Sequence, residues 1–114
     1  MKQMLQYKGY ESREDYLLGL YQSKTEVIIY DEGLDEWTFK YDKAKQRAGS
    51  CSHWNKQITL SRYLITEGNS DEEIMNTILH EVAHAIAPEA EHHGRVWRKI
   101  FRNLLIKYKA GPFR

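Results

Sequence analysis

The sequence predicts an α+β fold in which helices at both ends of the chain enclose a short three-stranded antiparallel sheet. Apolar residues recur at helical spacing before residue 35 and after residue 70, they alternate with polar residues at 37–41, and two further short segments between 46 and 60 fit strands. The length of 114 residues, without a Pro-rich or Ser-rich linker, predicts a single domain over residues 1–114.

The N-terminal region is predicted to be helical. Ser12 is a good N-cap, acidic residues follow it, and leucines supply an apolar side. The segment 25–34 is ambiguous, because Val27-Ile-Ile-Tyr30 favours a strand whereas the acidic pair before Gly33 is typical of a helix end. We favour a helix in this segment.

Three strands are expected in the middle of the chain, at residues 37–41, 46–51 and 57–60. In the first, large apolar and polar side chains alternate from Trp37 to Tyr41, as on a strand with one buried face. Residues 52–56 are typical of a turn, so we expect a small antiparallel sheet. Gly49 indicates a bulge or a close approach of the backbone to another group.

A second helical region begins at a predicted capping box. The Ser70 hydroxyl can accept a hydrogen bond from the backbone N–H of Glu73, the Glu73 carboxylate can reach back to Ser70, and Pro88 should end the helix. After a loop, Gly94 leads into a last helix with an apolar stripe that should pack in the core. The stripe comprises Trp97, Ile100, Phe101, Leu104, Leu105 and Tyr108, and Ala110-Gly111-Pro112 should end this helix.

The second helical region contains the sequence His80-Glu-Val-Ala-His84. Positions four apart lie nearly above one another on a helix, so the two imidazoles can bind one metal ion while Glu81 points into the same cleft. A catalytic zinc site uses three protein ligands and keeps a fourth position for water. The third ligand must come from the loop after the helix, where the candidates are Glu89, Glu91, His92 and His93.

Four segments of the chain, in order, resemble the SprT-like metallopeptidase family. They are Arg47-Ala-Gly-Ser-Cys51, Ile58-Thr-Leu-Ser-Arg62, His80-Glu-Val-Ala-His-Ala-Ile86 and His93-Gly-Arg-Val-Trp97, and the resemblance spans residues 37–101. The resemblance implies a small zincin-like domain that binds Zn²⁺. It implies His80, His84 and His93 as the zinc ligands, the last because Gly94 follows it, and Glu81 as the catalytic general base. His92 is the second choice for the third ligand.

The resemblance also implies the activity of a zinc-dependent metallopeptidase. Known relatives cleave proteins trapped on DNA or act near chromatin, so we expect a protein substrate, with DNA-associated or DNA-crosslinked proteins as one class. This chain would be a short form without the C-terminal zinc ribbon that such proteins often carry. Two alternatives stay open: a non-catalytic, zinc-stabilised module that binds nucleic acid or protein, and an inhibitor or regulatory protein built on the same scaffold.

Charge is segregated along the chain although the formal net charge is only +1. Segments 40–62 and 95–114 are basic, whereas 1–39 and 63–94 are acidic. The basic segments could bind DNA, pair with the acidic segments or stay solvated. No apolar run approaches the roughly 20 residues of a membrane span. We expect a cytoplasmic monomer, nucleoid-associated if DNA binds, and the short length would suit a phage or bacterial protein.

Other candidate residues carry weaker signals. Glu73, Asn76 and Thr77 share the histidine side of the helix and could support the ligands, although surface placement fits each equally well. His53 is expected at the surface or in packing rather than as a ligand. The single cysteine, Cys51, excludes an internal disulfide and a four-cysteine zinc site, and we expect it to be a small buried strand residue.

Overall fold

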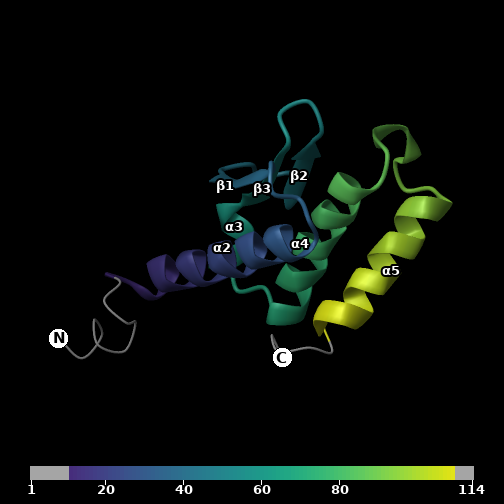
Figure 1. The fold of residues 1–114 in the computed structure, drawn as a ribbon. Helices are drawn as coiled ribbons and strands as arrows, with labels where there is room; N and C mark the ends of the chain where they lie inside the picture. The colour runs from purple at the N-terminus through teal and green to yellow at the C-terminus, as the bar shows by residue number, and fades with distance from the viewer. Residues whose placement is uncertain (1–10, 110–114) are drawn as a thin grey trace.

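The computed structural model describes residues 11–109 of the chain. It is an α+β structure, as predicted, with a small three-stranded sheet and four α-helices in the described part (Figure 1). The elements in chain order are α2 (Arg13–Asp31), β1 (Thr38–Asp42), β2 (Gly49–Ser52), β3 (Gln57–Ser61), α3 (Arg62–Thr66), α4 (Asp71–Ile86), the 3₁₀ turn η1 (Glu89–Glu91) and α5 (Arg95–Lys109).

The sheet is mixed rather than antiparallel, with strand order β1-β3-β2. The pairing of β2 with β3 is antiparallel, as predicted, but β1 runs parallel to β3, so the prediction was wrong for this pair. The reason lies in residues 43–48, which carry the chain past the end of β3 before β2 begins. Ser61 holds this connection: its hydroxyl donates to Ala44 O at 2.5 Å, and its N–H donates to Ala48 O at 2.8 Å.

Strand positions agree with the predictions to within one residue for β1 and β3, whereas β2 begins three residues later than expected. Residues 46–48 belong to the connection instead. The short helix α3 was not predicted; it begins directly after β3, where the Ser61 side chain accepts from the N–H of Tyr63 at 3.2 Å. One serine therefore organises both the loop before β2 and the helix after β3.

Helix α2 covers residues 25–31 of the ambiguous segment 25–34, which confirms the prediction of a helix there. The Ser12 hydroxyl accepts from Asp15 N at 3.0 Å at its start. Ile28 and Ile29 are buried against the rest of the molecule, so core packing outweighs the strand preference of the local sequence. Gly33, at a φ of +74°, ends the helix in the left-handed region that glycine adopts without strain.

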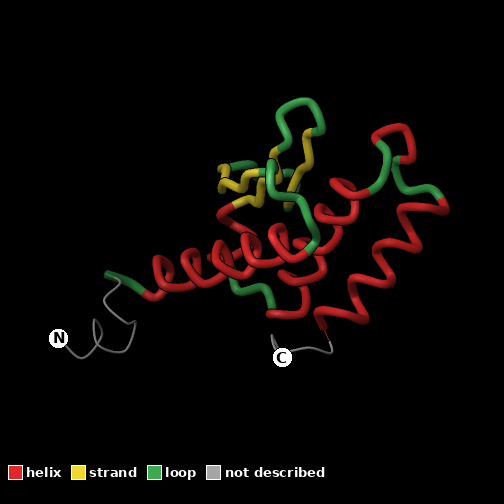
Figure 2. Tube along the Cα trace, viewed as in Figure 1, coloured by secondary structure: helices red, strands yellow, loops and turns green. Residues whose placement is uncertain are grey.

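Helix α4 occupies the centre of the molecule, with the sheet on one side and α5 on another (Figures 1 and 2). Both hydrogen bonds of the predicted capping box form at its start, and it ends at Ile86 before Pro88. Side chains from α2, β3 and α4 meet in the core, where the most completely buried large apolar residues are Ile28, Ile58, Leu60, Ile78, Leu79 and Val82.

The apolar stripe of α5 packs on this core, with Trp97, Leu104 and Tyr108 buried. The predicted end of this helix at 110–112 lies outside the described residues. No helix among residues 11–109 has the length and apolar character needed to cross a membrane.

Candidate metal and active site

The three candidate zinc ligands come together at one end of α4. His80 and His84 project from successive turns of the helix, and His93 reaches them from the loop between η1 and α5. The Nε2 atom of His93 lies 2.9 Å from Nε2 of His84 and 3.2 Å from Nε2 of His80. One nitrogen of each ring therefore points at a common centre, and all three nitrogens lie within 4.8 Å of one another.

This donor set fits a zinc ion. With Zn–N distances of about 2.0–2.1 Å, tetrahedral geometry places ligand nitrogens about 3.3 Å apart, close to the spacings of His93 from its two neighbours. Burial, followed by the nearby imidazoles, lowers the pKa of His84 to about 4, and burial together with His93 lowers that of His80. Metals bind the neutral imidazole, so these rings are in the correct protonation state at neutral pH.

The rings are backed by Trp97 of α5. Its indole is buried and lies 4.8, 5.1 and 4.6 Å, centroid to centroid, from the rings of His80, His84 and His93. Phe101 stacks on the indole at 5.0 Å, and its ring centroid lies 5.8 Å from that of His80. Aromatic contact on all three imidazoles restricts their rotation, which holds the nitrogens in position before any metal arrives.

The other loop candidates do not join the group of possible ligands. The carboxylate of Glu91 instead accepts from the N–H of Val96 at 3.0 Å, which caps the start of α5. His92 is exposed, adopts a φ of +51° and is not part of the ligand group. A side chain at Gly94 would lie 2.7 Å from Glu91 Oε1, so this glycine permits the tight turn that delivers His93.

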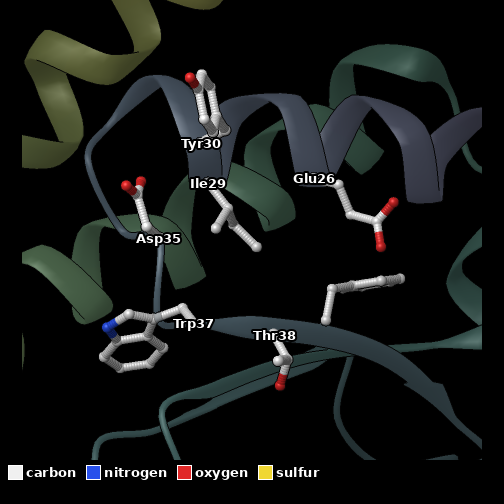
Figure 3. A pocket seen from close by; sticks show the side chains of 7 residues that line it. Glu26, Ile29, Tyr30, Asp35, Trp37 and Thr38 are labelled. Carbon is white, nitrogen blue, oxygen red and sulfur yellow. The ribbon is translucent and has the colours of Figure 1, made fainter.

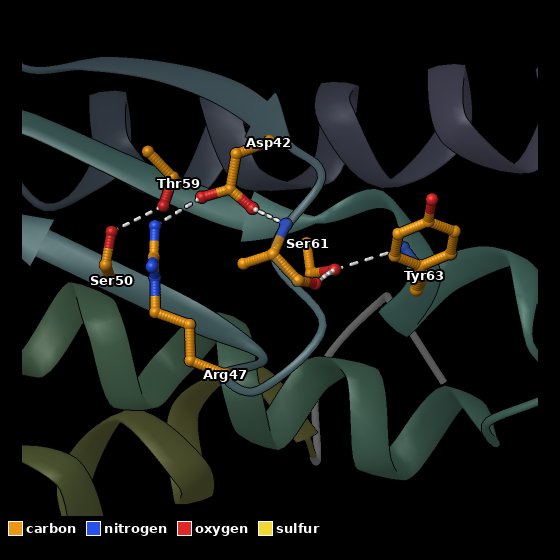
Figure 4. Close-up of polar contacts among 7 residues, drawn as sticks. Asp42, Arg47, Ser50, Thr59, Ser61 and Tyr63 are labelled. Carbon is orange, nitrogen blue, oxygen red and sulfur yellow. Dashed lines mark hydrogen bonds and ion pairs between the residues drawn. The ribbon is translucent and has the colours of Figure 1, made fainter.

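Glu81 is buried beside the imidazoles, with 7% of its surface exposed. Burial raises the pKa of its carboxyl to about 7, and the positive charge of Arg47 acts in the opposite direction. Arg47 is itself held by Asp42, with Nη2 to Oδ2 at 2.8 Å (Figure 4). A carboxyl that titrates near neutral pH inside a cleft can take up and release a proton.

Gly49 at the start of β2 makes room for Glu81. A Cβ at this position would lie 3.0 Å from Thr59 O and 3.1 Å from Cγ of Glu81. The close backbone approach that the sequence indicated at Gly49 is therefore present, and its partner is the candidate base.

Two cavities flank Glu81, and Gly49 and His80 line both of them. One, of about 390 Å³, extends over the imidazoles and is completed by Cys51, His53, His84, Glu89, His92 and His93. The other, of about 330 Å³, extends toward α5 and is completed by Ala48, Asn76, Thr77 and Phe101. Together they form an open cleft with the carboxyl in its middle.

The residues that carried weaker signals in the sequence have mainly structural roles. His53 lies against Trp37, and its Nε2 is 3.1 Å from Ala87 O, so it is a packing residue as expected. Cys51 is a half-buried strand residue, and burial raises the pKa of its thiol to about 12. Glu73 belongs to the capping box, whereas Asn76 and Thr77 line the cleft.

A family model described as the SprT-like family matches residues 20–109. This chain belongs to the SprT-like family. The match confirms the resemblance found in the sequence and extends it into α2 and to the end of α5. A comparison with curated proteins finds no match to the chain. Family membership suggests chemistry of the metallopeptidase type and agrees with a metal at the imidazoles.

Two features of this SprT-like site were not found from the sequence. The proximity of Arg47 to Glu81 depends on the loop that crosses the sheet, and nothing in the local sequence signals it. Trp97 was placed in the core by its helical spacing, but its contact with all three imidazoles depends on how α5 packs on α4. The catalytic and ligand roles of His80, Glu81, His84 and His93 remain predictions.

Proposed function

We propose that this protein is a zinc-dependent metallopeptidase that hydrolyses peptide bonds in protein substrates. The observation that carries the proposal is the convergence of three imidazoles beside a buried carboxyl in one open cleft. A structural zinc site would be closed by a fourth protein ligand, whereas a catalytic one has three and an open position. Among the described residues, three imidazoles and no fourth ligand form the group.

Each residue has a distinct task in the proposed reaction. His80, His84 and His93 would hold the zinc, with Trp97 fixing their rings. When bound, zinc supplies a Lewis acid for the peptide carbonyl and lowers the pKa of water from about 15.7 toward about 7. Glu81 would accept a proton from the attacking water and donate one to the leaving amine. Arg47 would keep part of the Glu81 population ionised by lowering its pKa.

The sheet offers a place for the substrate backbone. Strand β2 is an edge strand, and its first residue, Gly49, lines both cavities beside Glu81. An extended peptide can pair with such an edge, and this would align a peptide bond along the cleft. The open cleft therefore suits a segment of an unfolded or extended protein chain.

A non-catalytic zinc-stabilised module is the alternative. The buried position of Glu81 argues against it, because burying an ionisable carboxyl costs free energy and a purely structural site gains nothing from it. DNA-associated proteins as the substrate class stay part of the proposal and rest on family membership and on the basic segments alone.

The proposal is tested by metal content and casein cleavage in three variants. We expect one zinc per chain in the wild type and in Glu81→Gln, and loss of zinc in His80→Ala. Cleavage should fall by about 10²–10⁴-fold in Glu81→Gln, because a general base contributes in that range, and should be absent in His80→Ala. Glu89→Gln, a change of the same type at a cleft residue outside the ligand group, should keep both properties.

Two results would contradict this reading. Full zinc occupancy in His80→Ala would remove the ligand assignment. Unchanged cleavage in a zinc-loaded Glu81→Gln protein would remove the role of the carboxyl.

A further inference from the structure

A separate cavity lies between the C-terminal half of α2 and strand β1 (Figure 3). Its volume of about 610 Å³ exceeds that of either cavity beside the imidazoles, and it shares no lining residue with them. The lining residues are Glu26, Ile29, Tyr30, Asp35, Trp37, Thr38 and Phe39. Nothing in the proposed peptidase chemistry uses this cleft, which we call the α2–β1 cleft.

The α2–β1 cleft is framed at both ends by hydrogen bonds. Beyond one end, the hydroxyl of Tyr41 donates to Leu18 O at 2.6 Å, which joins β1 to α2. At the other end, the N–H of Leu34 donates to Ile29 O at 3.0 Å, and the N–H of Trp37 donates to Leu34 O at 2.9 Å. The walls therefore have fixed positions, and a ligand would meet a preformed site.

The walls of the cleft are apolar, and its two ends carry carboxylates. Ile29 points from the helix into the cleft, with Asp35 toward one end and Glu26 toward the other (Figure 3). Phe39, half-buried, adds an aromatic surface. Among the described residues, no cation forms an ion pair with Glu26 or Asp35.

Two lysines lie near the acidic segment around the cleft, but each pairs with a carboxylate that does not line the cleft. Lys56 pairs with Glu36, and Lys107 pairs with Glu32 at 2.8 Å. Residues 26–36 contain five acidic residues and no basic one. The carboxylates that face the cleft therefore present negative charge available to a partner.

Strand β1 borders the cleft and lies at the edge of the sheet. Its outer backbone groups pair with no other strand in the described part of the chain. Val27 and Tyr30 on the neighbouring helix are exposed, at 47% and 73% of their surface. An unpaired strand edge beside an apolar wall is suited to an extended peptide rather than to a compact small molecule.

We propose that the α2–β1 cleft is a docking site for an extended, basic segment of a partner protein. The peptide backbone would pair along β1. The methylene stem of a lysine or arginine would pack on Ile29 and Phe39, and its cationic head would lie near Glu26 or Asp35. This site does not depend on the peptidase activity and can be tested without it.

The three tryptophans provide a reporter for the site. Trp37 lines the cleft, Trp54 is 93% exposed in the turn between β2 and β3, and Trp97 is buried behind the imidazoles. The probe is an eight-residue peptide of alternating lysine and valine, and an equal peptide of glutamate and valine is the control. In ¹⁵N-labelled protein, the Trp37 indole resonance should shift on addition of the lysine peptide, and the Trp54 resonance should not.

Charge variants test the carboxylates. With a fluorescein-labelled lysine peptide, Glu26→Gln combined with Asp35→Asn should weaken binding by about twofold to thirtyfold, the range expected for the loss of two exposed ion pairs. Glu67→Gln combined with Glu72→Gln changes the net charge equally at exposed positions outside the cleft and should change the affinity by less than that. Circular dichroism of each variant verifies the fold.

The proposal is overturned by any of three results. These are an unmoved Trp37 resonance at saturating lysine peptide, equal binding of the glutamate peptide, or an equal loss of affinity in the two double variants. A Trp37 shift together with a loss confined to the cleft variant supports it.

Discussion

At the scale of single residues, the absence of a side chain at Gly49 matters as much as the carboxylate of Glu81. The strand passes so close to the helix that a Cβ would lie 3.1 Å from Glu81 Cγ. This close approach buries the carboxyl, and burial is the main cause of its raised pKa. A small residue in the strand thus controls the protonation of a group in the helix.

Gly49→Ala should reduce cleavage while zinc stays bound. The added methyl group must displace either the Glu81 side chain or β2, and misplacing a catalytic group by about 1 Å can cost up to 10²-fold in rate. We expect a loss of about tenfold to a hundredfold in kcat, measured on casein with metal content determined in parallel. Ser50→Ala, at the next position of the strand, adds no atom and should keep its activity; an equally active Gly49→Ala protein would contradict the steric argument.

At the scale of elements, the position of α5 depends on its attachment to α2. Near the C-terminal end of α5, Lys107 and Tyr108 both donate hydrogen bonds to the carboxylate of Glu32. At the other end of the same helix, Trp97 supports the imidazoles. The contact with Glu32 therefore helps to orient a helix whose function lies about two turns or more away.

Glu32→Gln should lower the free energy of unfolding at neutral pH and make that free energy less dependent on pH in the acidic range. Burial raises the pKa of Glu32, but the hydrogen bonds from Lys107 and Tyr108 outweigh it, so the pKa in the folded state is below 4.5. The carboxylate thus stabilises the fold above the unfolded pKa, and this contribution is lost as pH falls through the folded value. We expect a loss of about 1–2 kcal/mol at pH 7 in urea unfolding.

The control for this change is Glu67→Gln at an exposed position, which should unfold like the wild type at pH 7. A Glu32→Gln protein that loses as much stability as the wild type between pH 5 and pH 3 would show that another group dominates acid unfolding.

Strand pairing is the element-scale feature that the sequence described incorrectly. Alternation of apolar and polar residues identified β1, because side chains on a strand alternate whatever its neighbour is, and the turn-like residues 52–56 marked the strands on either side of them. Whether β1 runs parallel or antiparallel to its neighbour depends on which strand lies in the middle of the sheet, and here that strand is β3. The six-residue connection held by Ser61 decides this, and its course has no periodic signal.

At the scale of the whole molecule, the acidic N-terminal block of the sequence pairs with both basic blocks, through Glu36 with Lys56 and Glu32 with Lys107. Other charges of these blocks are not paired in this way: Glu26 and Asp35 line the α2–β1 cleft, and Arg98, Lys99 and Arg102 on α5 are exposed. Within the described part of the chain, none of these three cations forms an ion pair. Nucleic-acid binding by the basic segments stays a prediction, and exposed cations are what it requires.

If DNA binds through α5, its affinity should fall steeply with salt. Each phosphate contact contributes a slope of about −0.9 to log K against log salt concentration. Arg102→Gln should therefore lower the magnitude of that slope by about 1 in fluorescence anisotropy with a short duplex. Arg13→Gln, at the start of α2, removes one charge from an acidic region and should leave the slope unchanged. An affinity that does not change with salt would contradict electrostatic binding.

The sequence by itself determined the three long helices and two of the three candidate metal ligands. Caps at Ser12 and Ser70 act within three residues, and helical periodicity places His80 above His84 without reference to the rest of the fold. Only the tertiary structure decided that Glu81 is buried under Gly49 and that β1 pairs in parallel, and it brought His93, which the family resemblance had implied, to the other two imidazoles. These features depend on loops and on contacts between residues far apart in the chain, whereas hydrogen bonds of caps and helical turns form between near neighbours.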